Sequence, residues 1–428
     1  MNMFKRIKLS GWRQFSDIDI IFHDHLTVLT GANGAGKTTV LNLLSEMVGW
    51  DPQFVSAYKT NDNGQAKYYN SLAPNRNEQF IRDTDDNIVS NNDTYNKLGE
   101  LESSDGEIID LLIPNDVREG IYQIHLGAGK KEKGVYVNSH RPTFPYKALK
   151  SIPTEVVSRK QIYAKYIDFN KKYIFDTYRN PEELSATSLI KETLASLAIF
   201  SYESPSIRGN KEVEKLFQGY VKILKKVLPK ELGFENISMV VPEIMMCTKT
   251  GDFPLDAVSG GISSIIDITW QLYMFAEPTD PFVALIDEPE NHLHPALQKN
   301  FLGNLIEAFP HVQFIVATHN PFMITAQKDS NVYVLDYDEN HKVHSSRLDY
   351  VNRAGTSNAI LRDVLGLDST IPLWAVNELE EIITKYSQTD LSENSFDSLR
   401  EELKKIGLGD YIPETITKVI KKALGKND

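Results

Sequence analysis

The sequence contains a single cysteine, Cys247, which excludes a disulfide within the chain. Chains with so little cysteine are typical of reducing compartments, so we expect a cytoplasmic protein. Long apolar runs are missing too: no segment approaches the roughly 18 consecutive apolar residues that a membrane span requires, and residues 1–10 lack the apolar core of a signal peptide. We therefore expect neither secretion nor a membrane partner.

An excess of positive charge is also missing. The 428 residues include 46 Lys and Arg against 58 Asp and Glu, which gives a net charge of −12. This balance excludes a field that attracts nucleic acid over the whole surface, so a polyanion must meet a local basic patch. Hydrophobic residues make up 41% of the chain, enough for one large domain or two to three ordinary ones. We find no internal repeat, low-complexity tract or heptad array.

Hydrophobic periodicity divides the chain into expected elements. Apolar alternation or short apolar runs predict strands at residues 4–9, 18–22, 26–29, 121–126, 134–138, 284–286 and 312–317, and a hairpin of 332–335 with 342–346. Helical spacing predicts helices at 37–48 and 262–275, a helical stretch over 151–236, and short helices over 357–428. The sequence over 51–118 is rich in Asn, Asp, Ser and Gly and predicts loops with short strands, or a small antiparallel sheet.

The most informative motif follows the predicted strand at 26–29. Residues 31–38 read GANGAGKT, the G-x-x-x-x-G-K-[ST] pattern, and a helix is expected to begin there. Glycines let consecutive backbone N–H groups turn toward a phosphate, and the helix start adds its positive end. Lys37 would reach the β- and γ-phosphates, and the Thr38 hydroxyl would bind Mg²⁺. The predicted nucleotide-binding residues are Gly31, Ala32, Asn33, Gly34, Ala35, Gly36, Lys37, Thr38 and Thr39.

Polar residues also end two of the buried strands. Asp287 and Glu288 follow the strand at 284–286, and two acids at such a place are costly unless they hold an ion. We expect Asp287 to hold Mg²⁺ and Glu288 to act as general base toward water. His319 follows the strand at 312–317 and is expected to face the γ-phosphate.

A second glycine-containing helix start lies at Ser259, Gly260 and Gly261, just before the helix predicted at 262–275. Small residues at a helix start expose backbone N–H groups next to the positive end of the helix. The segment is thus a second phosphate-binding candidate, but it has no lysine of its own. An ordinary serine cap with a tight turn is the alternative interpretation.

Together and in this order, the four motifs resemble the ABC-type ATPases. The likeness is strongest to their soluble branch near SMC proteins and the OLD-family ATPases, which are AAA-family ATPases of bacterial anti-phage defence systems. The resemblance implies an α/β P-loop NTPase fold: a mixed sheet flanked by helices, with a helical insert and a short helical C-terminal tail. It implies that residues 31–38 are the Walker A loop, Asp287 and Glu288 the Walker B pair, residues 259–261 the signature motif, and His319 the switch histidine.

The resemblance also implies an assembly and cofactors. In the family, two subunits sandwich each ATP between one subunit's Walker A loop and the other's signature motif. We therefore expect ATP and Mg²⁺ as cofactors, ATP hydrolysis to ADP and phosphate, and a homodimer or higher oligomer in which Ser259, Gly260 and Gly261 act in trans. The expected layout is an ATPase lobe at 1–150, a helical insert at 151–240, a second ATPase lobe at 241–350 and a helical C-terminal region at 351–428.

Some residues fit the family pattern less closely. Arg13 is placed like the family's segment beside the adenine and is a candidate for ATP binding. No glutamine matches the family's Q-loop; Arg141 lies at about the right place and is expected to approach the nucleotide or the dimer face. His292 and His294 suggest zinc ligands, but no cysteine or third histidine accompanies them, so zinc is disfavoured.

Several functions are compatible with an ATPase of this kind. The long interval between Lys37 and Asp287 disfavours a transporter subunit, and the absence of heptad arms disfavours an SMC-like DNA-repair or DNA-maintenance ATPase. A single-chain OLD nuclease would need a TOPRIM domain after His319, whereas Asp336 and Asp338 fit a hairpin turn. Our hypothesis is a sensor or regulatory ATPase that controls a separately encoded effector. The kind of effector that we expect is a nuclease. An ATP-binding scaffold with very slow turnover is the alternative.

The helical insert offers a candidate patch for DNA or RNA. Basic residues cluster there and some alternate with tyrosines, a mixture suited to phosphate contact and base stacking. A solvated helix face is an equally good interpretation. The residues concerned are Lys215, Lys222, Lys225, Lys226 and Lys230, and then Arg159, Lys160, Lys165, Lys171 and Lys172 with Tyr163, Tyr166 and Tyr173.

Overall fold

The computed structural model describes residues 3–60, 66–72, 79–81, 83–84, 87–88, 94–127, 131–154, 158–175, 185–203, 208–275, 277–349, 357–367, 372–389 and 392–423. The chain forms two compact units, Met1–Ala354 and Gly355–Asp428. Within the described ranges, no helix has both the length and the apolar character needed to cross a membrane.

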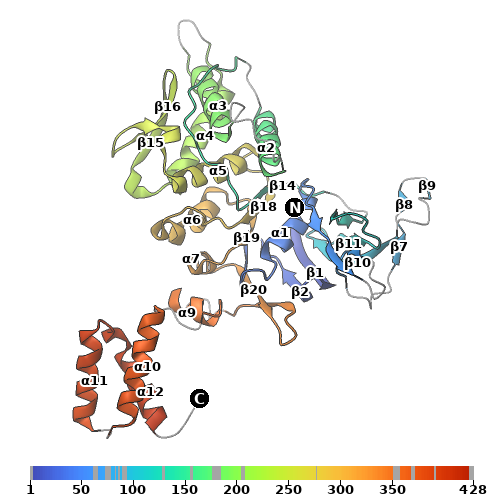
Figure 1. The fold of residues 1–428 in the computed structure, drawn as a ribbon. Helices are drawn as coiled ribbons and strands as arrows, with labels where there is room; N and C mark the ends of the chain where they lie inside the picture. Colours follow the sequence, from blue (N-terminus) through green and yellow to red (C-terminus); the bar gives the residue numbers. More distant parts are fainter. Residues whose placement is uncertain are drawn as a thin grey trace. The chain divides into compact units, whose positions relative to one another are not determined.

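A large mixed sheet forms the centre of the first unit (Figure 1). Its strands, in hydrogen-bonded order, are β13 (His125–Leu126), β11 (Ile108–Pro114), β10 (Thr94–Ser103), β1 (Phe4–Trp12), β2 (Phe15–Ile21), β21 (Val343–Arg347), β20 (Asn331–Tyr337), β3 (Leu26–Gly31), β19 (Val312–Ala317), β18 (Phe282–Asp287) and β14 (Gly134–Val137). The strands from β20 to β14 are parallel, whereas β10, β1 and β2 pair antiparallel. The sheet and its flanking helices confirm the predicted fold class.

Helices cover both faces of the parallel part of the sheet. The helix α1 (Lys37–Met47) packs against β3, β18 and β19, and its apolar residues share one core with alternate residues of those strands, such as Leu285 and Ile315. Figure 1 shows α6 (Pro295–Ala308) and α7 (Pro321–Ile324) on the other side of the strands. Strands β3, β14, β18 and β19 are buried along their whole length, as expected of strands covered on both faces.

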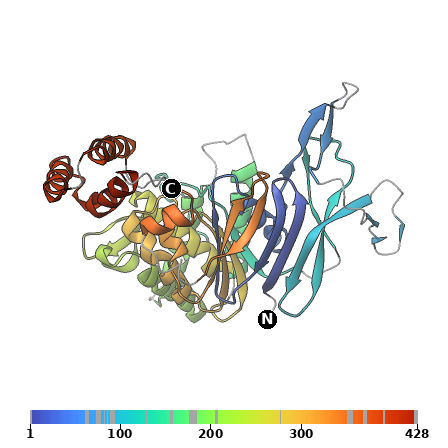
Figure 2. The same ribbon diagram turned by 90° about the horizontal axis from the view of Figure 1, so that it is seen from below.

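The N-terminal part of the sheet differs from the prediction. Residues 94–114 form an antiparallel pair, as one of the two expectations for this region had it, but β10 and β11 are long strands rather than short ones, and through β10 they extend the main sheet at β1 (Figure 2). Their alternation is broken by a bulge between Lys97 and Gly99, where a Cβ on Gly99 would lie 2.0 Å from the Lys8 carbonyl oxygen. The bulge interrupts the two-residue period of β10.

Smaller elements complete this region. The segment predicted as one strand at 121–126 is two: β12 (Ile121–Tyr122) pairs with β4 (Phe54–Val55), and β13 pairs with β11. The remaining short strands are β5 (Ala57–Thr60), β6 (Ala66–Tyr69), β7 (Gln79–Ile81), β8 (Asp83–Thr84) and β9 (Asn87–Ile88).

The helical insert follows β14. It contains α2 (Arg159–Phe175), α3 (Ala186–Ser201), α4 (Lys211–Val227) and the short η1 (Lys230–Leu232), and then a three-stranded sheet of β15 (Phe234–Val240), β16 (Glu243–Thr248) and β17 (Phe253–Pro254). The turn η2 (Leu255–Ala257) leads into α5 (Gly260–Phe275), which packs on β14 and α2. The domain boundary expected at residue 240 thus falls within the hairpin of β15 and β16.

The second unit is helical, with α9 (Ser357–Asp363), α10 (Leu373–Ser387), α11 (Glu393–Lys405), η3 (Gly409–Tyr411) and α12 (Ile412–Ala423). Apolar residues of α10, α11 and α12, including Leu379, Leu399 and Val419, form a core of their own. The prediction of short helices in this region is confirmed.

Candidate nucleotide site

The predicted phosphate loop is a turn between β3 and α1, and its conformation depends on glycine. Gly31, Gly34 and Gly36 have φ values of 132°, 81° and 96°, a region that side chains disfavour. A Cβ on Gly36 would lie 2.4 Å from the Phe15 ring. The Lys37 ammonium lies within the turn, since Nζ donates to the carbonyl oxygens of Gly31 at 2.9 Å and Ala32 at 3.0 Å. Burial lowers the pKa of this group.

The end of β18 meets the start of α1. The Thr38 hydroxyl donates to Oδ2 of Asp287 at 3.0 Å. Asp287 is only 2% exposed, and burial raises the pKa of its carboxyl group to about 6. A hydroxyl and a carboxylate are hard oxygen donors of the kind that Mg²⁺ prefers. This donor pair, next to a lysine held within a glycine turn, fits a Mg²⁺–nucleotide complex.

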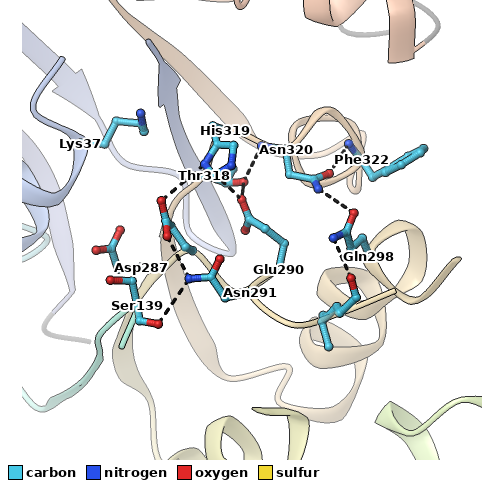
Figure 3. A network of polar contacts seen from close by, with 12 residues as sticks. Lys37, Ser139, Asp287, Glu290, Asn291, Gln298, Thr318, His319, Asn320 and Phe322 are labelled. Atoms are coloured by element: carbon cyan, nitrogen blue, oxygen red, sulfur yellow. Dashed lines mark hydrogen bonds and ion pairs between the residues drawn. The ribbon is translucent and has the colours of Figure 1, made fainter. Parts of the chain in front are cut away.

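Glu288 occupies a strained position directly after this strand. Its φ is 47°, which is uncommon for a residue with a side chain, and such strain is often found at functional sites. Its Oε1 lies 3.4 Å from Nδ1 of His319, and its Oε2 accepts a hydrogen bond from Nδ2 of Asn291 at 2.9 Å. In Figure 3, Lys37, Asp287 and His319 lie near one another, with Asp287 below the other two. The structure thus brings together three motifs that are far apart in the sequence.

Further polar groups hold these residues in place (Figure 3). Glu290 is 5% exposed; it accepts a hydrogen bond from the Thr318 hydroxyl and lies 3.9 Å from Nδ1 of His319. Burial raises the pKa of Glu290. Asn320 donates to Oε1 of Gln298 at 2.7 Å, which fixes the loop after β19. Gln298, on α6, was not predicted as a site residue from the sequence.

Arg141 lies against the backbone of the Walker B segment. Its guanidinium is buried and donates to Oγ of Ser264 at 2.8 Å, to the Asp287 carbonyl oxygen at 3.2 Å and to the Glu288 carbonyl oxygen at 2.8 Å. It thus joins the Walker B segment to α5. Its approach to the nucleotide or to a dimer face stays a prediction.

Arg13 lies in an aromatic cluster. Its guanidinium carbon is 4.8 Å from the centroid of Trp12 and 5.3 Å from that of Phe54, and it donates to the Val55 carbonyl oxygen at 2.7 Å. The next residue, Gln14, donates to the Gly34 carbonyl oxygen at 3.4 Å. The segment therefore adjoins the phosphate loop, and contact of Arg13 with ATP stays a prediction.

The predicted signature segment begins α5. Ser259 and Gly260 are exposed, whereas Gly261 is buried against the segment after Walker B: a Cβ there would lie 2.8 Å from the His292 carbonyl oxygen. Oγ of Ser259 accepts from the backbone N–H of Ile262 at 3.5 Å. The trans role of these residues stays a prediction. Nearby, Nδ1 of His294 caps α6 by accepting from the N–H of Ala296 at 3.3 Å, a structural use of this histidine.

The basic residues of the insert fall into two groups. On α2, two of them serve internal contacts: Arg159 donates to the Tyr273 hydroxyl at 2.8 Å and Lys171 to the Gly49 carbonyl oxygen at 2.9 Å, whereas Lys160, Lys165 and Lys172 are exposed. Tyr166 is buried, so it cannot stack on a base; the side chain of Tyr173 lies outside the described residues. The lysines of the second group lie on α4 and η1 and are exposed: Lys215, Lys222, Lys225, Lys226 and Lys230.

A family model described as "AAA domain, putative AbiEii toxin, Type IV TA system" matches residues 26–325. Septu protein PtuA of Bacillus thuringiensis is 24% identical over 94% of this chain and 97% of that protein. Retron Vc95 probable ATPase of Vibrio cholerae serotype O1 biovar El Tor is 22% identical over 78% and 73%, respectively. Endonuclease GajA of Bacillus cereus (strain HuB5-5) is 20% identical over 70% and 52%.

Solved structures give a weaker match. The SMC head domain from Thermotoga maritima is 15% identical and aligns with 81% of this chain and 99% of that chain, with a TM-score of 0.38.

Proposed function

Because the chain belongs to the AAA-domain family whose model matches residues 26–325, we propose that it binds ATP with Mg²⁺ and hydrolyses it to ADP and phosphate. One observation carries this proposal: the phosphate loop, Asp287, Glu288 and His319 converge at the carboxyl ends of adjacent parallel strands. Ligands of open α/β sheets bind at that edge.

Each residue has a role in this proposal. The backbone of residues 31–39 and the Lys37 ammonium hold the phosphates, and Thr38 and Asp287 would hold Mg²⁺, which neutralises phosphate charge when bound. Glu288 accepts a proton from the attacking water. Its Oε2 is already engaged by Asn291, which leaves Oε1 on the side of His319. His319 then donates a hydrogen bond to the γ-phosphate.

We further propose a homodimer, or a higher assembly of such dimers, in which Ser259 and Gly260 complete the nucleotide site of the partner subunit. Both residues are exposed at the start of a 16-residue helix, and the motif to which they belong contains no lysine. A helix start of this kind binds anions through its N–H groups and dipole. Hydrolysis would then require two chains.

For the biological role, we propose a sensor or regulatory subunit in bacterial anti-phage defence. It would act in the cytoplasm on a separately encoded effector, and a nuclease is the effector that we propose. It is supported by the sequence resemblance to defence ATPases and by relatives named after Septu and a retron. One relative is named an endonuclease, and this chain covers 52% of it. DNA or RNA contact is proposed for the exposed lysines of α4 and η1 and for Lys160, Lys165 and Lys172 of α2, since Arg159 and Lys171 serve internal contacts.

The deciding experiment compares ATP turnover of the purified chain with that of Glu288→Gln. We expect turnover to fall at least about 100-fold while ATP still binds, because only the base is lost, and we expect ATP-dependent dimers to accumulate on a sizing column. Glu307→Gln, an exposed acid on α6, is the matched control and should behave as the parent. Parent turnover as slow as that of Glu288→Gln would favour the scaffold alternative. DNA cleavage by the chain alone would refute a separate effector.

A further inference from the structure

A lysine ammonium is completely buried in the helical insert, outside the nucleotide site. The side chain of Lys191, on α3, has no exposed surface. Its Nζ lies 2.6 Å from Oε2 of Glu243 on β16 and 2.8 Å from Oδ2 of Asp256 on η2, and it donates to the Lys147 carbonyl oxygen at 2.8 Å. One ammonium thus joins four segments that are distant in the sequence.

The contact with Asp256 connects the insert to the signature segment. Asp256 lies three residues before Ser259, its side chain is also completely buried, and its Oδ2 accepts a further hydrogen bond from the backbone N–H of Lys147 at 3.0 Å. A buried carboxylate whose cation is removed is strongly unfavourable, so Asp256 stays where the ammonium holds it. The position of the segment from Asp256 to Ser259 therefore depends on α3.

The same segment is held on its other side by the ATPase body. Gly261 lies against the His292 carbonyl oxygen, with no room for a Cβ, and Ser264 accepts from Arg141 at 2.8 Å. Between these two attachments Ala257, Ser259 and Gly260 are exposed, and of these Ser259 and Gly260 belong to the predicted signature motif. A shift of α3 would thus move Ser259 and Gly260 relative to the body.

We propose that Lys191 is a positioning residue for the signature motif, through which the helical insert sets Ser259 and Gly260 for the nucleotide held by the partner subunit. The inference rests on the proposed function, in which these residues act in trans. A buried ammonium can also be a plain part of a core, so the test has to separate loss of the trans surface from general damage to the chain.

Mixing two variants that are defective at different helix starts distinguishes loss of the trans surface from general damage to the chain. Lys37→Ala damages the cis phosphate loop and leaves the signature segment intact, and Ser259→Arg does the reverse. In a random 1:1 mixture half of the dimers contain one chain of each kind, and each has one intact site of two, so about a quarter of parent turnover should return. Lys191→Met should act like Ser259→Arg: inactive alone, restored by Lys37→Ala, and with ATP binding in cis within about twofold of the parent.

A second variant guards against misfolding. Lys191→Met leaves the carboxylates of Glu243 and Asp256 without their cation, which can destabilise the fold. A double variant, Lys191→Met combined with Asp256→Asn, removes the charges of both residues in the Lys191–Asp256 contact. Thermal unfolding shows whether the single and the double variant are folded, and those that are folded are used in the mixing assay. Glu243→Gln keeps the bridge between Lys191 and Asp256 and should retain most of the parent turnover.

The outcomes discriminate between the two proposals. Restoration of the Lys191 variant to the level of Ser259→Arg supports the inference. Restoration of Ser259→Arg but not of the Lys191 variant, or full activity of the Lys191 variant alone, overturns the inference and leaves the shared site standing. If Ser259→Arg itself is not restored by Lys37→Ala, the shared site is refuted, and the inference with it.

Discussion

The two glycine-bearing helix starts of this chain obtain their shape from different sources. In the phosphate loop, the ammonium that binds the turn comes from the motif itself: Lys37 donates to Gly31 and Ala32, six and five residues away. At the start of α5, the ammonium is on Lys191, 65 residues before its partner Asp256, and belongs to the insert. The first device is self-contained, whereas the second depends on another part of the fold. A self-contained device suits constant nucleotide capture, and a dependent one suits control.

Removal of Lys37 should have the largest effect and should fall on binding. We expect Lys37→Ala to weaken ATP binding in cis by at least about 100-fold, a loss of about 2.7 kcal/mol, because the phosphates lose their nearest cation. Titration with a fluorescent ATP analogue measures this. Ser259→Arg, at the other helix start, should leave that titration unchanged while turnover is lost. Equal loss of cis binding in both variants would contradict the comparison.

Arg141 connects the two halves of the comparison, since it contacts Ser264 on α5 and the carbonyl oxygens of Asp287 and Glu288. We expect Arg141→Met to lower kcat by roughly 10- to 100-fold with little change in ATP affinity, because a base displaced by a small distance loses most of its effect.

Two readouts distinguish this positioning role. Unpaired buried carbonyl groups cost about 1–3 kcal/mol each, so the unfolding free energy of Arg141→Met should also fall. Arg141→Lys retains one charged donor and should recover part of kcat. A variant that loses ATP affinity and kcat alike would show instead that Arg141 contacts the nucleotide.

The same contrast decides what could be predicted from the sequence. The phosphate loop was found complete, because strand, glycine turn and lysine are contiguous and its chemistry is local. Asp287, Glu288 and His319 were found because each directly follows a buried apolar strand. The structure brings these three residues together, but the roles assigned to them stay predictions.

The missed features all depend on long-range contacts. The role of Arg141 depends on carbonyl oxygens of a strand 146 and 147 residues away, which no local pattern encodes. The full length of β10 was not predicted, because the bulge at Gly99 interrupts its two-residue period. On α2, Tyr166 seemed suited to stacking by its neighbours in sequence, but its hydroxyl group is buried against Asp267 of α5.

Asp267 offers the smallest and most selective test of α5. It is buried on α5, accepts hydrogen bonds from the Tyr166 hydroxyl and from Gln271, and interacts with the charge of Arg141. Burial raises the pKa of its carboxyl group to about 6, above the ordinary 3.8. A raised acid pKa favours the folded state only while the group is protonated, so this stabilisation is complete below about pH 4 and lost as the pH rises through 6.

Asp267→Asn should therefore flatten the pH dependence of the unfolding free energy between pH 4 and 7, by at most about 3 kcal/mol relative to the parent. Turnover at pH 7.5 should stay within about twofold, since Asp267 touches neither the exposed residues of the signature segment nor the phosphate loop. Denaturant unfolding at several pH values measures the first effect, with Asp280→Asn, a half-exposed acid, as control. A large loss of turnover in Asp267→Asn without loss of stability would mean that α5 is controlled from its buried face as well as from Lys191, and the contrast between the two helix starts would then extend along the whole of α5.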